Sequence, residues 1–380
     1  GNATYAAGTV QVRQTDQAGN ASSATSNGSP ITVDTLNPIA VVSVISQIVD
    51  DTGTPGDFIT SDGVVTVSGT FSGALGVGET IQVSANGGAT WVTAGISSPV
   101  WVATDVALVN GSGTLTTRTV DTAGTAVSGA SHSYVYSLVY TGTPGPDSLV
   151  GTAADEQFYG LAGNDTINGG GGTDTMYGGL GDDIYTVDSL ADSVREEPGE
   201  GSDLVYSSVS WTLPDNVERL SLTGSAAVSA TGNGLANTLS GQNNGAANAL
   251  TGGAGDDAYY VGMGDSVNEA AGGGNDIVYS KISWTLSANV ERLYLYGTTQ
   301  GVTGTGNGLA NKLHAHDNGF ADTLVGGQGD DIYEVRSNDV IVELTSQGSD
   351  TANCYDNYTL AAGVSVENLL LYVTAAKTLT

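Results

Sequence analysis

Apolar side chains recur at intervals of nine residues between Gly142 and Thr186. The segment divides into five units, which read GTPGPDSLV, GTAADEQFY, GLAGNDTIN, GGGGTDTMY and GGLGDDIYT. The eighth positions of these units are all apolar and are occupied by Leu149, Phe158, Ile167, Met176 and Tyr185. Glycines permit turns with positive φ, and an apolar residue on the short strand that follows can face an interior. A nine-residue period of this kind predicts a parallel β-roll.

A second, longer repeat includes the last of these units. The string GGLGDDIY from Gly178 returns as GGAGDDAY from Gly252 and as GGQGDDIY from Gly326, a spacing of 74 residues each time. Strand-like runs such as LVYSSVSWTL and IVYSKISWTL separate the copies. Aromatic residues at matching positions, which we expect in the core rather than in a sugar-binding platform, are Trp211, Trp284 and Tyr358. Self-similarity at a fixed period predicts a solenoid whose neighbouring units cover each other's apolar faces.

The first part of the chain has a different pattern. Residues 37–140 contain strand-like runs, among them VVTVSGTF, ETIQVSA and SYVYSLVY, at a spacing typical of a β-sandwich. In residues 1–36 the string RQTDQAGN from Arg13 is similar to RTVDTAGT from Arg118, which suggests the closing strands of a preceding copy. We therefore predict an all-β chain, with a sandwich over residues 37–140 and a parallel β-roll or β-helix solenoid over residues 141–380.

The sixth positions of the nine-residue units carry the candidate chemistry. They are all acidic and are occupied by Asp147, Glu156, Asp165, Asp174 and Asp183. A carboxylate beside glycine-rich turns supplies the hard oxygen ligands that Ca²⁺ prefers. In a roll with two strands per coil, alternate units stack, so Asp147, Asp165 and Asp183 should line one edge. Each Ca²⁺ ion should lie between stacked turns and take carboxylate and glycine carbonyl oxygens.

The longer repeats extend this set of candidate ligands. The full set of predicted metal ligands is Asp147, Glu156, Asp165, Asp174, Asp182, Asp183, Asp203, Asp256, Asp257, Asp276, Asp322, Asp330, Asp331 and Asp350. Three acidic pairs keep a seven-residue separation and leave two interpretations open, extra Ca²⁺ ligation or turn capping. These pairs are Glu196 with Asp203, Glu269 with Asp276, and Glu343 with Asp350.

Other acidic and amide positions of the repeats are assigned differently. Amides replace the sixth-position acid at Asn237, Asn248 and Asn311, where we expect fewer or weaker ions and an asparagine ladder as an alternative. A third acid of each repeat should pair with arginine or stay solvated, and this group is Glu218, Glu291 and Glu367.

The charge balance agrees with cation binding. The chain has 9 basic and 40 acidic residues, a net charge of −31. A compact domain this acidic repels itself unless cations neutralise it, and it lacks the basic side chains that nucleic acid requires. A merely solvated or disordered acidic surface is the alternative, but here the acids are periodic and interleaved with apolar strand residues.

Composition also limits other chemistry. The one cysteine, Cys354, excludes an intramolecular disulfide, and its register with Ser207 and Ser280 indicates a small strand filler. His314 and His316 replace turn residues of the preceding repeat and are interpreted as an incidental surface pair. No run of about 18 apolar residues predicts a membrane span. Neither HExxH nor GxSxG occurs, and the acids follow the repeats, so we do not expect an enzyme.

These motifs resemble a known family. Residues 142–380 resemble the C-terminal region of RTX proteins, which Gram-negative bacteria export by type I secretion. Residues 37–140, with DDTGTPGDFITSDG and VGETIQVSANGGATW, resemble the bacterial Ig-like repeats of large RTX adhesins and biofilm proteins. The resemblance implies an Ig-like sandwich over 37–140 and the C-terminal strands of a preceding Ig-like repeat over 1–36. It also implies a roll over 141–380 that folds when extracellular Ca²⁺ binds.

The functional expectations come from this resemblance. It implies a calcium-dependent structural or adhesive module at the bacterial surface, with calcium as partner and a host, cell-surface or matrix ligand, or further copies of itself, as candidates. The alternatives are a surface-layer lattice protein and the non-catalytic C-terminal region of a secreted hydrolase or toxin. The resemblance further implies a Ca²⁺-rigidified junction around a cluster of acids, namely Asp34, Asp50, Asp51, Asp57 and Asp62.

Overall fold

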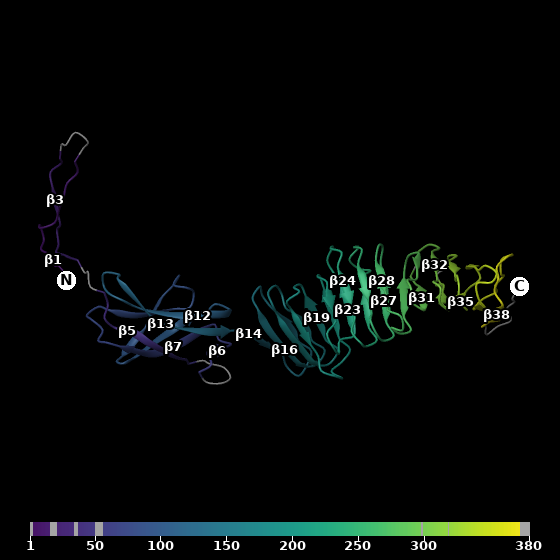
Figure 1. Cartoon of the computed structure of the whole chain (residues 1–380), viewed down its shortest axis with the longest axis horizontal. Coiled ribbons are helices and arrows are strands. Elements are labelled where there is room, and N and C mark those ends of the chain that lie inside the picture. The colour runs from purple at the N-terminus through teal and green to yellow at the C-terminus, as the bar shows by residue number, and fades with distance from the viewer. Residues whose placement is uncertain are drawn as a thin grey trace. The chain divides into compact units, whose positions relative to one another are not determined.

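The computed structural model describes residues 3–15, 21–33, 37–49, 56–297, 299–317 and 319–372, and these residues form strands and turns without a helix (Figure 1). The chain divides into two compact units, residues 1–138 and 139–380. No helix that could cross a membrane is found in the described part of the chain.

The first unit contains a two-sheet sandwich. One sheet has the order β10 (Gly95–Ser97), β11 (Val100–Ala107), β7 (Val64–Ser72) and β5 (Val41–Ile48). The other has the order β6 (Ile59–Thr60), β13 (Ala126–Tyr136), β12 (Gly111–Val120), β8 (Thr80–Ser84) and β9 (Val92–Thr93). Alternate residues of β7 are buried, as expected of a strand with one face on a core. Both sheets contribute to one apolar core that includes Val67 and Trp101 from the first and Leu115 and Tyr134 from the second.

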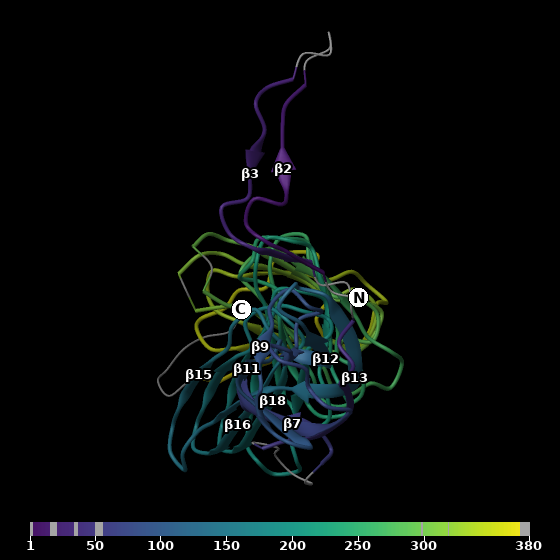
Figure 2. The same cartoon turned by 90° about the vertical axis from the view of Figure 1, so that its left-hand side faces the viewer.

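Two short ladders precede the sandwich. Strand β1 (Ala3–Tyr5) pairs with β4 (Ile31–Val33), and β2 (Gln11–Val12) pairs with β3 (Thr25–Ser26), both antiparallel. Figure 2 shows β2 and β3 side by side.

The second unit is a parallel β-solenoid, as the nine-residue period predicts. Its long sheet has thirteen strands in chain order. They are β15 (Ser148–Val150), β17 (Thr166–Asn168), β19 (Ile184–Val187), β21 (Leu204–Ser207), β23 (Arg219–Leu222), β25 (Thr238–Ser240), β27 (Ala258–Val261), β29 (Ile277–Ser280), β31 (Arg292–Leu295), β33 (Lys312–His314), β35 (Ile332–Val335), β37 (Thr351–Cys354) and β38 (Asn368–Leu371).

Three four-stranded sheets, here called the short sheets, alternate along the chain with strands of the long sheet. The first comprises β14 (Leu138–Thr141), β16 (Glu156–Ala162), β18 (Thr175–Leu180) and β20 (Ser193–Arg195). The second comprises β22 (Trp211–Thr212), β24 (Ser229–Thr231), β26 (Ala249–Thr251) and β28 (Ser266–Asn268). The third comprises β30 (Trp284–Thr285), β32 (Thr303–Thr305), β34 (Thr323–Val325) and β36 (Val340–Val342).

The solenoid core is built from one inward row on each side. The eighth-position residues Phe158, Ile167, Met176 and Tyr185 are fully buried, and Leu149 packs against them. Cys354 is buried in this core, as the filler interpretation predicts, and burial raises the pKa of its thiol to about 11. The prediction that the repeat aromatics belong to the core is also confirmed for Trp211 and Tyr358, and Trp284 is half-buried and packs against the same core.

Each 74-residue repeat is a set of four coils. From Ile184 to Ala258, successive long-sheet strands pair at separations of 20, 15, 19 and 20 residues, which together make 74. The 15-residue coil is too short to continue the short sheet, so β20 and β22 belong to different sheets, and so do β28 and β30. The breaks between the short sheets therefore come from the one short coil of each repeat.

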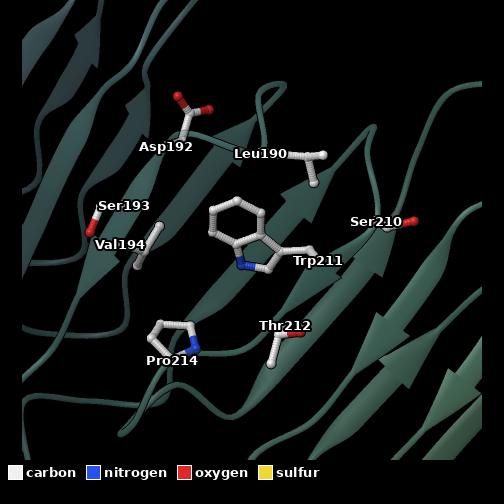
Figure 3. A pocket seen from close by; sticks show the side chains of 8 residues that line it. All are labelled: Leu190, Asp192, Ser193, Val194, Ser210, Trp211, Thr212 and Pro214. Atoms are coloured by element: carbon white, nitrogen blue, oxygen red, sulfur yellow. The ribbon is translucent and has the colours of Figure 1, made fainter.

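A groove lies at the first of these breaks. It has a volume of about 360 Å³ and lies among residues of β20 and β22 and the adjacent turns. Figure 3 shows the indole of Trp211 among Leu190, Val194 and Pro214. Only 9 % of Trp211 is exposed, so the groove offers a ligand little of the indole face.

Candidate metal centres

A ladder of acidic side chains runs along the edge of the solenoid where the turns enter the long sheet, here called the long-sheet edge. Asp183 Oδ1 accepts a hydrogen bond of 2.7 Å from the backbone N–H of Asp165, one coil earlier. The same bond, at 2.7–2.9 Å, links equivalent positions along the solenoid. The accepting residues are Asp165, Asp183, Asp203, Asp257, Asp276, Asp331 and Asp350. The predicted alignment of Asp147, Asp165 and Asp183 on one edge is therefore confirmed.

The opposite edge, here called the short-sheet edge, carries a shorter version of the ladder. Asp174 Oδ1 accepts the N–H of Glu156 at 2.9 Å, and Asp192 Oδ1 accepts that of Asp174 at 3.1 Å. Further along, Asp322 Oδ1 accepts the N–H of Val302 at 2.9 Å, and Asp339 continues the row. The two edges thus place acids on both sides of the apolar core.

The second carboxylate oxygen of many ladder residues is buried and has no hydrogen-bond partner. This applies to Oδ2 of Asp165, Asp174, Asp183, Asp203, Asp257, Asp276, Asp322 and Asp331. These residues are at most 1 % exposed. A buried carboxylate oxygen without a partner is costly to the fold, and a bound cation removes that cost. All eight belong to the predicted ligand set, and their bare oxygens fit a hard divalent cation such as Ca²⁺.

Glycines leave room beside these oxygens. A Cβ at Gly160 would overlap Asp165 Oδ2 and would lie 2.6 Å from the carbonyl oxygen of Gly178. The turn therefore keeps open a space that a carboxylate and a glycine carbonyl border, which is the mixed ligand set predicted from the sequence. Asp165, Asp183 and the Gly178 carbonyl would hold an ion at this position.

The electrostatics of the ladder point the same way. Burial raises the pKa of Asp183 and of Asp331 to about 7, and like charge on the neighbouring ladder acids adds to the effect, while the backbone hydrogen bonds oppose it. Burial also raises the pKa of Asp203 and of Asp257, to about 6. On the other edge burial raises the pKa of Asp174 to about 7. Each shift means that the charged carboxylate is unfavourable here without a cation.

Other predicted ligands are satisfied by the protein itself. Asp147 accepts the Thr143 hydroxyl at 2.9 Å, and Glu156 accepts the Thr152 hydroxyl, so each caps its own turn. Asp182, Asp256 and Asp330 are exposed, and each accepts a backbone N–H from the next coil at 2.9 Å. Their positions differ from that of the buried row.

The third acid of each repeat is a ladder member, which corrects a prediction. Glu218 Oε2 accepts the N–H of Asp203 at 2.9 Å, and Glu291 and Glu367 make the same bond one and two repeats later. The expected pairing with arginine or with solvent is wrong for the half-buried Glu218 and Glu291. The 15-residue coil explains the error, because it takes Glu218 and Glu291 out of the nine-residue period from which the other ladder positions are predicted.

The amides occupy the ladder without bare oxygens. The backbone N–H of Asn237 donates to Asp257 Oδ1. Its side-chain Nδ2 donates to the carbonyl oxygens of Val217 at 3.3 Å and Glu218 at 3.4 Å. Asn311 repeats this pattern. The amide therefore supplies through its own donors what a cation would supply beside an aspartate, and the expectation of fewer ions there stays a prediction.

Some candidates lie elsewhere or have other partners. Asp34, Asp50 and Asp51 of the predicted junction site lie outside the described residues, while Asp57 and Asp62 each accept a backbone N–H two residues on at 3.0 Å. The interpretation of His314 as an incidental turn residue is wrong, because it is half-buried on strand β33. It stacks on Tyr294 with ring centroids 4.1 Å apart, and its Nδ1 lies 2.6 Å from Glu334, which also bonds Lys312.

Comparison with known proteins identifies the repeats. Residues 150–185 and 315–334 match the family model of the RTX calcium-binding nonapeptide repeat, in four copies. A search of curated proteins found no match. The solenoid therefore contains RTX calcium-binding repeats, and Ca²⁺ is the cofactor that such repeats bind.

Proposed function

Because the solenoid contains RTX calcium-binding repeats, we propose that this chain is a calcium-dependent extracellular module of a type I-secreted protein, with a structural or adhesive role at the bacterial surface. The Ca²⁺ ions complete the fold outside the cell, and the sandwich acts as an Ig-like spacer. The module carries out no catalysis, because its acids occupy repeat positions between stacked coils.

The row of bare, buried carboxylate oxygens supports this proposal most directly. Eight aspartates present an unpartnered oxygen inside the solenoid, and burial raises the pKa of several of them. Such a row is unfavourable in a cell with little free Ca²⁺, so the solenoid should remain unfolded there and suitable for export. It becomes favourable where Ca²⁺ is abundant.

The energies involved are sufficient. Extracellular Ca²⁺ modules bind with Kd values of about 10⁻⁴–10⁻³ M. At millimolar Ca²⁺ an ion with a Kd of about 10⁻⁴ M contributes roughly 1.4 kcal/mol, so about four or more such ions together reach the stability of a typical domain, about 5–15 kcal/mol. Calcium can therefore decide between the folded and unfolded solenoid.

Circular dichroism of the full chain tests the folding part of the proposal. In millimolar CaCl₂ we expect a strong β signal and a cooperative thermal transition of the solenoid, and in EGTA we expect the loss of both. Mg²⁺ at the same concentration serves as control, because it prefers a rigid octahedron with several retained waters. An identical spectrum and midpoint in CaCl₂ and EGTA would contradict the mechanism.

The surface role needs its own test. Beads coated with the chain should adhere to bacterial cells or to their extracellular matrix in CaCl₂ and detach in EGTA. Control beads coated with serum albumin should not adhere in either buffer. Calcium-dependent folding without any adhesion would leave the structural role and remove the adhesive one.

A further inference from the structure

Three groups of carboxylates recur once per 74-residue repeat, and we call them the acid triads. They are Asp183–Glu196–Asp203, Asp257–Glu269–Asp276 and Asp331–Glu343–Asp350. In each triad, one carboxylate oxygen from every residue lies within 4.8 Å of the others. The two aspartates are neighbours on the long-sheet edge, and the glutamate comes from the turn that follows a short-sheet strand.

Bare oxygens point to a cation at these triads. Asp183 Oδ2, Glu196 Oε2 and Asp203 Oδ2 are all buried without a hydrogen-bond partner. The three residues are 0 %, 8 % and 0 % exposed. The second triad repeats the arrangement, with bare oxygens on all three of its acids. Three carboxylates gathered in this way repel one another unless a cation lies among them.

A tyrosine and a glycine shape each triad. The hydroxyl of Tyr185 donates to Glu196 Oε1, which fixes one oxygen of the glutamate and leaves the other facing the two aspartates. A Cβ at Gly178 would overlap Asp183 Oδ2 and the Tyr185 hydroxyl, although the φ of Gly178 does not require glycine. The glycine and tyrosine contacts recur at the other two triads, where the pairs are Gly252 with Tyr259 and Gly326 with Tyr333. At the third triad the other oxygen of Glu343 accepts the backbone N–H of Leu344, so only Asp331 has a bare oxygen there.

The triads differ from the ordinary nine-residue turns in their donor set. Between Asp165 and Asp183 the residue that corresponds to Glu196 is Gly178, which offers only its carbonyl oxygen. The replacement of glycine by glutamate therefore adds a third charged oxygen ligand. Affinity for Ca²⁺ rises with the number of charged ligands and with the rigidity of the site.

From these observations we propose that the acid triads are a second class of Ca²⁺ site, held by three carboxylates, which fills at lower free Ca²⁺ than the nine-residue turns. This inference rests on the proposed function, because it assumes that the solenoid binds Ca²⁺. Each four-coil repeat then has one tight ion that orders it before the weaker sites fill.

Terbium luminescence reports on the triads directly. Tb³⁺ is a hard cation that can replace Ca²⁺, and a tyrosine close to it sensitises its emission. The hydroxyl of Tyr259 donates to Glu269 of its triad. The next residue, Tyr260, instead stacks on Tyr279, with ring centroids 4.8 Å apart. In the full chain titrated with TbCl₃, the combined variant Tyr185→Phe, Tyr259→Phe and Tyr333→Phe should lose most of the tyrosine-sensitised emission. The matched variant Tyr177→Phe, Tyr260→Phe and Tyr355→Phe should keep most of it.

Counting ions tests the donor set. The combined variant Glu196→Gln, Glu269→Gln and Glu343→Gln should lose three tightly bound Ca²⁺ ions in native mass spectrometry. By calorimetry its tightest class should weaken by at least about tenfold, since each triad loses one charge. The control is Asp188→Asn, Asp215→Asn and Asp317→Asn, which removes the same number of charges at three exposed acids outside the triads and the ladders and should keep the tight class.

The outcomes separate this inference from the proposed function. Unchanged ion number and affinity in the triad variant, or equal luminescence in the two tyrosine variants, would overturn the second class of site while leaving calcium-dependent folding intact. A wild-type chain that binds no Ca²⁺ and keeps its fold in EGTA would overturn both.

Discussion

The sandwich buries neutral hydroxyl groups, whereas the solenoid buries ionisable carboxyl groups. Every buried polar residue of the described sandwich is a serine or threonine, namely Thr60, Ser84, Thr117 and Thr119. The solenoid buries a row of aspartates and glutamates on each edge of its core. Up to residue 140 the chain has 2 basic and 9 acidic residues, and the remainder has 7 basic and 31 acidic. The sandwich can therefore fold on apolar burial alone, whereas the solenoid needs a counter-charge.

The two units also use glycine differently. In the sandwich a Cβ at Gly69 would overlap the backbone carbonyl oxygen of Val44 and the indole of Trp101, so glycine there permits the close approach of the neighbouring strand and of a core side chain. In the solenoid Gly178 keeps space beside carboxylate oxygens. We therefore expect the two all-β units to depend on different solution conditions for their stability.

Removal of Ca²⁺ should give the largest difference in stability between the two units. In EGTA we expect the solenoid to unfold at room temperature and the sandwich to keep its transition, because among the described residues only those of the solenoid include buried acids. The loss is the sum of several binding contributions of roughly 1.4 kcal/mol each at millimolar Ca²⁺. Tryptophan fluorescence and near-UV circular dichroism during thermal melts of the full chain can follow both units. Simultaneous loss of both transitions would show that the sandwich depends on calcium too.

A core truncation in the sandwich should give the converse result. Trp101 is fully buried, and Trp101→Ala removes the largest side chain of that core. We expect a loss of about 3–5 kcal/mol from the sandwich, equal in CaCl₂ and EGTA. The control is the exposed Val77→Ala, for which we expect a change within about 0.5 kcal/mol. Chemical denaturation at both calcium levels measures these values, and a calcium-dependent loss would refute the independence of the units.

Acid should partly replace calcium in the solenoid. Burial raises the pKa of Asp183 and Asp331 to about 7 from 3.8, so the folded form binds more protons than the unfolded form between those values. Stability of the calcium-free solenoid therefore falls as the pH rises through this window. We expect the calcium-free solenoid to regain part of its β signal and a thermal transition at about pH 5, whereas at about pH 7.5 it stays unfolded.

With Ca²⁺ present the dependence on pH should reverse, because protons then compete with the ions for the same oxygens. Thermal melts of protein stripped of calcium on a chelating resin, and of the same protein in CaCl₂, across this window provide the measurement. A calcium-free solenoid that is most stable at neutral pH would show that the buried acids are not the source of its instability.

The sequence predicts the period of the fold well and its exceptions poorly. Phe158, Ile167 and Met176 follow from the nine-residue pattern, because one short strand per unit leaves a single inward position. Asp165 and Asp183 follow for the same reason. The ladder position of Glu218 does not follow from the pattern, because a 15-residue coil breaks the period on which the alignment depends. The role of Glu196 also stayed open, because only the folded coil shows that it reaches the two aspartates from a different turn.

The smallest effect should come from an exchange of amide and acid in the ladder, which compares two kinds of coil within the solenoid itself. Asn237→Asp replaces a side chain whose Nδ2 donates to the carbonyl oxygens of Val217 and Glu218. In little free Ca²⁺ the new carboxylate faces those oxygens without a donor, so we expect a loss of about 1–3 kcal/mol. In CaCl₂ a carboxylate beside carbonyl oxygens is a suitable ligand set, and we expect one additional bound ion and a net change below about 1 kcal/mol.

Native mass spectrometry and thermal melts at limiting and saturating CaCl₂ can measure both effects of Asn237→Asp. Asn311→Asp tests the equivalent position of the next repeat, which has the same hydrogen bonds. The reverse change, Asp257→Asn, removes a bare oxygen and should lose an ion. An Asn237→Asp loss of the same size at both calcium levels would mean that the carbonyl oxygens of this coil are not placed for a cation. The amide would then be there for its hydrogen bonds alone, and the difference between amide and acid coils would no longer predict where ions bind.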